Sequence, residues 1–476
     1  MTKLALREFH AFDAAGARFL YLVPSAAIVR LDEPSAAVLR VLEEGPKKRE
    51  AIIAEVGWRH GDDEVASAID ELLDIRAVGA AAVPPERILK VLPARDFPLT
   101  TMVLNVTSKC NLACKYCYEY GEDRVVDEVV QKELPRFMDY ETARQAVDFM
   151  FESAGSNEAV NLTFFGGETL LNFQVLQRTV VYALGRGAAL GKDVRFSLTT
   201  NGTLLKPEII EWLIDNQVGV TISVDGPRET QDEHRVFHNG KGSYDVMMPK
   251  VRELLRRNNA GSIGARVTLT KQNMDVVRVF RHLTEEIGFQ EVGFAPVTTS
   301  WTRDFALGEE GYTSMLDQFE FLAREFVESA VAGRHHAFGN IKETLEEIHK
   351  GVSKAYPCGA GLGLVGVATD GDVALCHRFA GSDEHRVGSV HTGLDRARQA
   401  AFLERNHLAN KTDCSTCWAR PICSGGCYHE AHTRYGTTEQ PNLHYCDWIR
   451  SWTDICLKIY AELAERSPGY FDRFDA

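Results

Sequence analysis

Three cysteines within eight residues constrain this chain more than any other feature of its sequence. They occur as Cys110-Asn-Leu-Ala-Cys114-Lys-Tyr-Cys117 and directly follow the apolar run 99–106, which predicts a buried strand. A cubane iron–sulfur cluster takes one thiolate on each of its four irons, so three protein ligands leave one iron open to a small molecule. The alternative is a structural zinc site whose fourth ligand lies elsewhere in the chain.

Three glycine-containing motifs follow the cysteines, each at the end of a predicted strand. They are Gly166-Gly167-Glu168, Thr200-Asn201-Gly202 and Ser223-Val-Asp225-Gly226. Glycine lets backbone approach a ligand closely. The order of these motifs, together with the Cys-x3-Cys-x2-Cys spacing, resembles that of the radical S-adenosylmethionine (SAM) enzymes.

This resemblance implies a 4Fe-4S cluster on the three cysteines, whose open iron chelates the amino and carboxylate groups of SAM. One electron then cleaves SAM to methionine and a 5′-deoxyadenosyl radical. Glu168 would hold the SAM amino group, and Arg235 would pair with the SAM carboxylate. The predicted SAM contacts are Tyr116, Gly166, Gly167, Glu168, Asn201, Ser223, Asp225 and Arg235.

Strands and helices alternate from residue 99 to about residue 330. Six strands are predicted at 101–106, 160–165, 194–199, 218–223, 263–269 and 290–295. Helices are predicted around 139–153, 172–189, 206–216, 245–258 and 273–286. This alternation predicts an α/β fold with a parallel sheet and right-handed crossovers. Six βα units make a partial (β/α)6 TIM barrel, whose chemistry is expected at the carboxyl ends of the strands.

The first ninety residues form a separate unit. A hairpin and three helices are predicted, at 19–23, 26–31, 33–42, 48–56 and 64–73. This pattern resembles a small winged helix, but residues 1–90 hold 12 Lys and Arg against 15 Asp and Glu, and DNA binding needs a basic face. We expect instead a peptide-recognition domain, in which a leader peptide adds a strand to the edge of the hairpin.

A second cysteine constellation follows near the C-terminus. It comprises Cys358, Cys376, Cys414, Cys417, Cys423, Cys427 and Cys446, with Gly371 inside the first gap. This spacing resembles the SPASM extension of radical SAM enzymes that mature peptides; a zinc ribbon is the alternative.

The SPASM resemblance implies two auxiliary clusters, and hence three iron–sulfur clusters in all. Cys414, Cys417, Cys423 and Cys446 would hold one of them. Cys358, Cys376 and Cys427 would hold the other, which has no fourth cysteine and therefore an open iron or a ligand of another type. Cys456 matches no position and is expected to be a core thiol of a helix.

His377 marks a departure from the sulfatase-maturing members of the family, which oxidise a Cys or Ser to an aldehyde. In those members an aspartate base follows the counterpart of Cys376. His377 stands there in this chain and is our candidate catalytic base, because imidazole can accept a proton near neutral pH. The replacement favours enzymes that form thioether crosslinks from Cys to Asp or Glu over formylglycine-forming maturases. A third possibility is a leader-peptide-binding module whose clusters are only structural.

Composition limits the partners and the compartment. The net charge of −14 argues against a nucleic-acid partner, and no stretch has the length of a membrane span or the pattern of a signal peptide. We therefore expect a cytoplasmic protein, in which eleven cysteines indicate metal or redox chemistry. The expected partners are a Cys-containing peptide or small protein with a leader segment and a low-potential electron donor of the flavodoxin or ferredoxin type.

The predicted organisation has four segments. These are a winged-helix-like domain over 1–92, the partial barrel over 93–330, a bridging helical segment over 331–357 and a SPASM domain with a C-terminal helix over 358–476.

Overall fold

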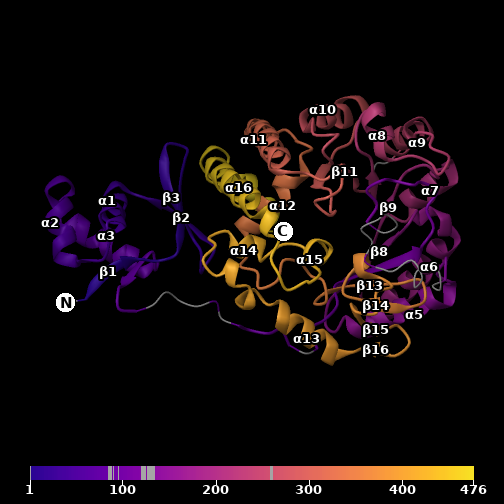
Figure 1. Ribbon diagram of the computed structural model, residues 1–476, viewed down its shortest axis with the longest axis horizontal. Coiled ribbons are helices and arrows are strands. Elements are labelled where there is room, and N and C mark those ends of the chain that lie inside the picture. The colour runs from indigo at the N-terminus through magenta and orange to yellow at the C-terminus, as the bar shows by residue number, and fades with distance from the viewer. Residues whose placement is uncertain are drawn as a thin grey trace.

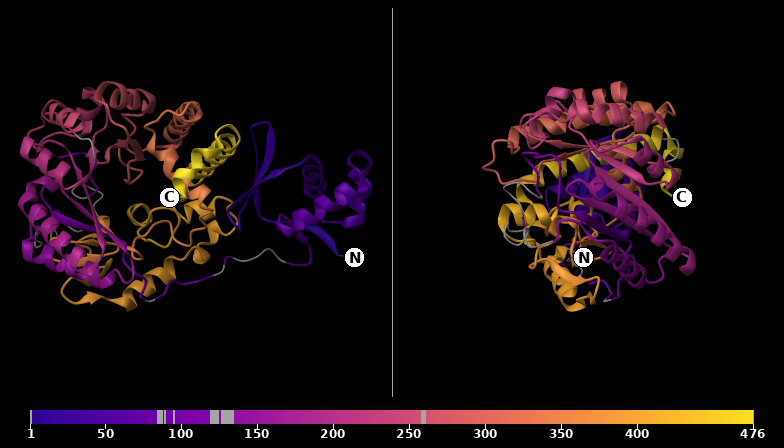
Figure 2. Two further views of the ribbon diagram at one scale, coloured as in Figure 1. Left: turned by 180° about the vertical axis from the view of Figure 1, so that it is seen from behind. Right: turned by 90° about the vertical axis from the view of Figure 1, so that its right-hand side faces the viewer.

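The computed structural model describes residues 2–83, 88, 90–94, 96–118, 125, 135–257 and 261–475. A group of N-terminal helices lies at one end of the long axis and a curved sheet with its helices at the other, with C-terminal elements between them (Figure 1). The view from behind shows the same order (Figure 2). Among the described residues, no helix combines the length and the apolar character needed to cross a bilayer.

The curved sheet contains ten strands in the order β12-β11-β10-β9-β8-β7-β13-β14-β15-β16. Its first six are parallel to one another and neighbours in chain order. They are β7 (Thr101–Thr107), β8 (Ala159–Gly166), β9 (Asp193–Thr200), β10 (Gly219–Ser223), β11 (Ile263–Leu269) and β12 (Val292–Pro296). This arrangement confirms the predicted partial barrel.

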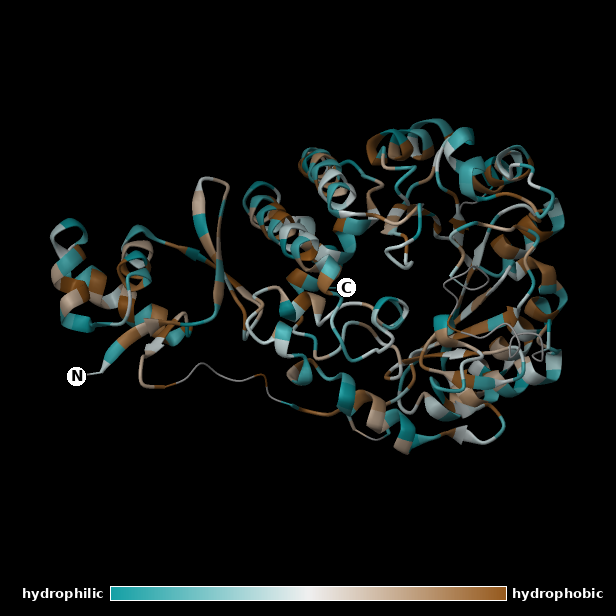
Figure 3. Ribbon diagram, in the orientation of Figure 1, coloured by the Kyte–Doolittle hydropathy of each residue, from teal (hydrophilic) through white to brown (hydrophobic). Residues whose placement is uncertain are grey.

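Helices cover the outer face of these strands (Figure 1). They are α5 (Tyr140–Ser153), α6 (Phe173–Leu190), α7 (Pro207–Asp215), α9 (Tyr244–Arg257) and α10 (Val276–Arg281), with short turns η1 (Thr169–Asn172) and η2 (His282–Ile287). Each helix has a hydrophobic and a hydrophilic side (Figure 3), so each can bury one face against the sheet. Helix α8 (Arg228–His234) was not predicted because RETQDEH contains no apolar residue.

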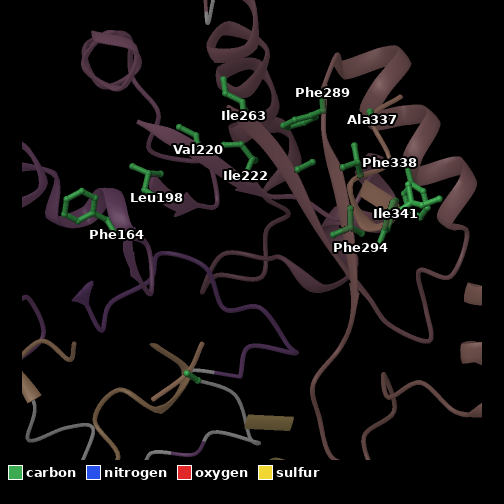
Figure 4. Packing of buried hydrophobic residues seen from close by; sticks show 14 of the residues in the cluster. Phe164, Leu198, Val220, Ile222, Ile263, Phe289, Phe294, Ala337, Phe338 and Ile341 are labelled. Atoms are coloured by element: carbon green, nitrogen blue, oxygen red, sulfur yellow. The ribbon is translucent and has the colours of Figure 1, made fainter. Parts of the chain in front are cut away.

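The core lies between the strands and these helices. Phe164, Leu198, Ile222 and Ile263 are buried on the successive strands β8, β9, β10 and β11 and belong to one continuous cluster (Figure 4). Full burial of each such side chain contributes about 1.5–3 kcal/mol. On the other face of the strands, small or polar side chains leave the interior of the barrel open.

The C-terminal segment begins by extending the barrel sheet. Strand β13 (Leu364–Val367) pairs in parallel with β7, and three antiparallel strands follow, β14 (Asp372–Ala374), β15 (Arg386–Ser389) and β16 (Gly393–Leu394). The sheet therefore continues across the domain boundary predicted near residue 358.

Long helices complete the wall of the molecule between the barrel and the N-terminal unit. Helix α16 (Cys446–Arg466) packs on α11 (Glu309–Val331) and α12 (Gly339–His349). Shorter helices α13 (Arg396–Asn406), α14 (Arg420–Cys423) and α15 (Tyr428–Tyr435) carry or border the C-terminal cysteines, with turns η3 (His377–Phe379), η4 (Leu408–Asn410), η5 (Thr412–Cys414), η6 (Leu443–Tyr445) and η7 (Pro468–Phe474).

The N-terminal unit has two small sheets and three helices. The predicted hairpin is confirmed as β3 (Ala17–Leu22) and β4 (Ala27–Leu31), and the predicted helices as α1 (Glu33–Glu43), α2 (Arg49–His60) and α3 (Asp62–Asp74). Four further strands were not predicted: β1 (Lys3–Leu6), β2 (Phe9–Ala14), β5 (Lys47–Lys48) and β6 (Val78–Ala80).

Strand β3 has two buried faces. Leu20 and Leu22 belong to the core formed with α1, α2 and α3, whereas Phe19 and Tyr21 belong to the main core of the molecule. Because successive side chains of a strand point to opposite faces, one strand joins the two cores. The hairpin is therefore part of the junction between the N-terminal unit and the rest of the protein.

Candidate active site

A cavity of about 940 Å³ lies inside the barrel. The cysteine loop at the end of β7 forms one side of it, together with Gly166, Gly167 and Asn201. His377 and Arg378, which directly follow Cys376, form another part of the wall. The first cysteine loop and the two residues that follow Cys376 therefore border one space.

The first cysteine loop is fixed by backbone hydrogen bonds to the segment after α8. Ala113 N donates to Val236 O at 2.7 Å, and Lys115 N donates to His234 O at 3.2 Å. His238 lies on the cavity wall, and its Nε2 is 3.0 Å from Cys110 O. These contacts hold the three thiols in place at the carboxyl end of β7.

The glycine turn lies directly against this loop. A Cβ built at Gly167 would be 2.3 Å from Lys109 O and 2.9 Å from Cys110 N. Gly166 has φ +131°, and a Cβ there would be 2.3 Å from Thr107 O. Any larger residue at either position would displace the cysteine loop. Glycine at these two positions therefore allows the turn and the loop to approach each other closely.

Glu168 and Asn201 form a rigid polar cluster beside the turn. The Glu168 carboxylate is 1% exposed and accepts hydrogen bonds from Thr200 Oγ1 at 2.6 Å and from Asn201 N at 2.8 Å. Burial raises the pKa of Glu168. Asn201 lines the cavity, whereas Glu168 lies behind it, so the SAM contact predicted for Glu168 stays a prediction.

Asp225 is likewise buried, with no exposed surface, and binds three neighbours. It accepts hydrogen bonds from Tyr116 OH and from Thr268 N (3.1 Å), and its Oδ2 lies 3.0 Å from Arg235 Nε. Tyr116, Arg235 and Ser223 line the cavity. Asp225 thus orients two of the predicted SAM contacts and does not itself line the cavity.

The remaining predicted cluster ligands fall into two groups. A nearby thiolate raises the pKa of another, and in this way Cys427 acts on Cys358 and on Cys376. In the same way Cys417, Cys423 and Cys446 raise the pKa of Cys414, and Cys417 and Cys446 raise that of Cys423. These are the two sets that the SPASM resemblance implies, whereas Cys456 is buried in α16 near Thr344, as predicted for a core thiol.

The donor atoms suit clusters better than single ions. A tetrahedral zinc with Zn–S of about 2.3 Å holds its sulfurs about 3.8 Å apart. Among the described residues, no three cysteines have all their sulfurs within 4.8 Å of one another, and the trio that meets this limit, Glu384, His385 and His432, contains no cysteine. Burial raises the pKa of Cys110 and Cys114 to about 11 and that of Cys376 and Cys414 to about 12, so a bound metal is needed to make them thiolates.

A buried lysine supports the same conclusion. Lys411 is 3% exposed, and its Nζ has no hydrogen-bond partner among the described residues. Burial lowers its pKa, and thiolates of Cys414, Cys423 and Cys358 act in the opposite direction. Burying an ammonium group without a counter-ion costs free energy. The positive charge of Lys411, which lies between the two sets of cysteines, therefore fits anionic clusters held by these cysteines.

His377 lies on the cavity wall, and its ring centroid is 4.6 Å from that of Phe165. Burial, together with Arg378, lowers the pKa of His377 to about 3. Its Nδ1 is buried and has no partner among the described residues. The ring is therefore neutral and available as an acceptor, but it holds a proton weakly, and its role as a catalytic base stays a prediction.

Several charged cavity residues were missed at the level of sequence. Arg266, Arg378, Glu291, Glu343 and His238 all line the cavity. One signal was present, since Gly264-Ala-Arg266-Val-Thr268 places an arginine on the inward face of an otherwise apolar strand. Nothing local indicates Glu343, which reaches the cavity from α12.

Comparisons with known proteins agree with the fold. Residues 104–283 match the family model of the Radical SAM superfamily. The radical SAM cyclopropyl synthase TigE of Paramaledivibacter caminithermalis is 25% identical over 78% of this chain and 75% of its own. The serine-type anaerobic sulfatase-maturating enzyme of Bacteroides thetaiotaomicron is 26% identical over 73% and 86%.

Among solved structures, native anSMEcpe with bound AdoMet superposes with a TM-score of 0.65 at 21% identity and covers 77% of this chain and 100% of its own. The family implies one 4Fe-4S cluster and SAM, for which the cysteine loop and the adjoining cavity have suitable donors and space. Cys110, Cys114 and Cys117 lie within residues 104–283, the part of the chain that matches this family model.

Proposed function

We propose that this chain modifies a peptide or small protein and joins a cysteine sulfur to the methylene carbon of an Asp or Glu side chain. The observation that carries this proposal is the shared cavity, which is bordered by the Cys110 loop on one side and by His377 and Arg378 on another. In length and flanking residues the chain resembles the maturase of the quinohemoprotein amine dehydrogenase small subunit, which makes such links.

The chain's own residues would position and enclose the reactants. Cys110, Cys114 and Cys117 would hold the cluster, and Tyr116, Asn201, Ser223 and Arg235 would surround SAM. Once bound, this pair supplies the 5′-deoxyadenosyl radical that removes a hydrogen atom from the substrate. Phe165 and the neutral ring of His377 would keep water away from the reacting carbon.

Formation of the carbon–sulfur bond also requires the thiol to lose a proton and the site to lose an electron. Cys358, Cys376 and Cys427 would hold a cluster close to the cavity that receives this electron, and Cys414, Cys417, Cys423 and Cys446 would hold a third cluster. Potentials of such clusters span roughly −700 to +450 mV according to ligands and burial, so two differently ligated clusters could act in series.

Residues 1–92 would recognise the substrate. Strand β4 is an edge strand of the sheet β2-β3-β4, so its outer backbone groups can pair with an added strand. A cavity of about 570 Å³, lined by Ala27, Ile28 and Arg30 of β4 and by residues of α16, lies beside this edge. A leader peptide paired to β4 would have space there for its side chains.

A second candidate is aldehyde formation of the sulfatase-maturing type. Relatives named for sulfatase maturation favour it, and anSMEcpe has been solved with the Kp18Cys peptide. His377 in place of an aspartate argues against it, because the sulfatase-maturing enzymes have an anionic base at this position, whereas the buried imidazole is neutral.

Product mass separates these reactions. The reconstituted enzyme is incubated with SAM, a reductant and any small Cys-containing peptide that is found to co-purify with it. A thioether removes two hydrogens and ties two residues together, so fragmentation between them yields no separate ions. An aldehyde alters one residue only. Absence of 5′-deoxyadenosine would exclude both reactions and leave a binding module.

A further inference from the structure

Arg266 occupies a central position in the barrel cavity. It lies in the middle of β11, whose other inward residues are Gly264 and Thr268. In the sheet it is level with Ser223 of β10 and with Gly293 of β12. A Cβ built at Gly293 would be 3.1 Å from Arg266 Nη1, so the glycine leaves the space into which the guanidinium extends.

This guanidinium has no anionic partner within the described part of the chain. No carboxylate oxygen there lies within 4.0 Å of it, and its nitrogens make no side-chain hydrogen bond. The carboxylate that acts on it most strongly belongs to Glu343 across the cavity, and this group too has no ion-pair partner among the described residues. Arg266 is therefore a cation that faces an open space.

A second cation faces the same space. Arg378 lines the cavity, stacks over the Tyr118 ring at 4.6 Å and donates to Thr298 Oγ1 at 3.2 Å. Its charge opposes that of Arg266, so the two guanidinium groups add positive charge to one cavity. Two like charges held in this way create a site for a negative group.

We propose that Arg266, with Arg378 opposite, binds a side-chain carboxylate of the substrate and so places the carbon next to an acidic group beside the cysteine loop. This rests on the proposed function and names the acceptor as Asp or Glu from the chemistry of the cavity. The planar guanidinium matches a carboxylate with two parallel hydrogen bonds, which fixes orientation as well as position. Arg266 is thus the residue that determines specificity for the acceptor side chain.

Two other roles for Arg266 make different predictions. It could hold the SAM carboxylate, because Ser223, a predicted SAM contact, is level with it. It could also be a counter-charge for Glu343 with no ligand of its own. In the first case its loss would raise the SAM concentration needed for 5′-deoxyadenosine formation, and in the second case it would leave substrate choice unchanged.

The experiment uses the reconstituted, SAM-loaded full-length enzyme as wild type, Arg266→Met and Arg266→Lys, with Arg256→Met as the matched control. Arg256 is exposed on α9, where it pairs with Glu253. The probes are short synthetic peptides with one cysteine and one acceptor position, identical except for Asp, Glu, Asn, Gln or Leu at the acceptor. Peptide affinity, 5′-deoxyadenosine formation and crosslinked mass are measured separately.

The wild type and Arg256→Met are expected to bind the acidic peptides roughly 10- to 100-fold more tightly than the amide peptides, as for a charge-assisted hydrogen bond. Arg266→Met should abolish this preference with little change in SAM concentration dependence, and Arg266→Lys should retain part of it. An undiminished preference in Arg266→Met, no preference in the wild type, or a raised SAM requirement in Arg266→Met would each overturn the proposal.

The design also separates this inference from the proposed reaction. If acidic peptides are preferred through Arg266 but no peptide gains a crosslink, the thioether reaction is wrong and the carboxylate site stands. If crosslinks form equally on acidic and apolar acceptors, the reaction stands and the role of Arg266 is wrong.

Discussion

The two cysteine-bearing regions of this molecule are built in opposite ways. The first, around Cys110, Cys114 and Cys117, lies on a barrel whose six parallel strands have a continuous apolar core. The second, between residues 407 and 427, has no regular element longer than the four residues of α14. In the first region the fold positions the thiols, whereas in the second the thiols and their ligand would have to hold the loops.

Polar contacts show the same difference. The first loop is attached to the barrel by main-chain hydrogen bonds. The second also has main-chain hydrogen bonds, such as that from Lys354 N to Pro421 O. In addition it depends on Arg420, which is 7% exposed, donates to the carbonyls of Ser415 and Cys417 and pairs with Glu8 of the N-terminal unit. A region held by a few buried charges and bound metal depends more strongly on each of them than a packed barrel does.

The largest expected effect is the loss of catalytic activity in a variant that keeps its fold. Replacement of Cys110, Cys114 and Cys117 by Ala should abolish 5′-deoxyadenosine formation, because no other described residues offer a cluster with an open iron beside the glycine turn. Iron content should fall from on the order of 12 to on the order of 8 per chain if all clusters are cubanes. The circular dichroism of the variant should match that of the wild type.

A variant that retains on the order of 12 irons would show that these cysteines are not ligands. A variant that loses nearly all its iron would show that the C-terminal sets depend on the first cluster, contrary to the proposed independence of the two regions.

Removal of C-terminal ligands should instead damage structure. Replacement of Cys414 and Cys417 by Ala leaves the loops around α14 without the ligand that would hold them, so residues 407–427 should become susceptible to limited proteolysis. The barrel should stay resistant, because Ile422 is the only described residue of this segment among the buried residues of its core. Cleavage sites are identified by mass spectrometry, with the Cys110/Cys114/Cys117 variant as control. Equal protection of residues 407–427 in both variants would contradict the idea that the second region, unlike the barrel, depends on its thiols and their ligand for its structure.

Lys411 should have a smaller, electrostatic effect. Replacement by Met removes a buried positive charge beside Cys414, Cys423 and Cys358, so both proposed auxiliary clusters should become harder to reduce. Lys350→Met is the control, since Lys350 is exposed and pairs with Glu346 on α12. Spectroelectrochemical titration in the Cys110/Cys114/Cys117→Ala background measures the shift. Unchanged potentials in Lys411→Met would show that the ammonium is not close to the clusters.

The sequence predicted the barrel well because its signals are local and repeated. Alternating apolar strands and amphipathic helices fix a parallel sheet, and the predicted strand at 263–269 is β11 to the residue. The continuation of that sheet into β13 and β14 could not be predicted, because it joins residues that are more than 250 positions apart. A separation of more than 100 positions likewise explains why Arg378 and Arg266 were not predicted to line one cavity.

The site was predictable in its cysteines and only partly in its polar residues. Motif spacing identifies Glu168 and Asp225, but it does not show that both lie behind the wall they were expected to form. That depends on neighbours from other segments, such as Thr200 of β9 for Glu168 and Tyr116 of the cysteine loop for Asp225. The spacing of residues in the sequence therefore indicates which residues belong to the site more readily than it indicates where their side chains point.

The smallest expected effect concerns the contact between the N-terminal unit and the second cysteine region. His10 of β2 stacks on Trp418 with ring centroids 3.7 Å apart, and its Nε2 lies 2.6 Å from Asp454 Oδ1 of α16. Trp418 directly follows Cys417, so the N-terminal sheet packs on the loop of a predicted cluster. Deletion of the whole unit would therefore disturb that loop as well as any peptide binding.

A point substitution avoids this difficulty. His10→Ala removes one stacked ring pair and one hydrogen bond, which together contribute about 1–3 kcal/mol to the docking of the unit. Hydrogen exchange should increase in β2 and around Trp418, while β7 to β12 keep their protection. His60→Ala on α2 is the control, since α2 lies on the far side of the unit from α16 (Figure 1). If exchange around Trp418 stays unchanged, the N-terminal sheet does not stabilise the cysteine loop, and the deletion becomes a clean test of peptide recognition.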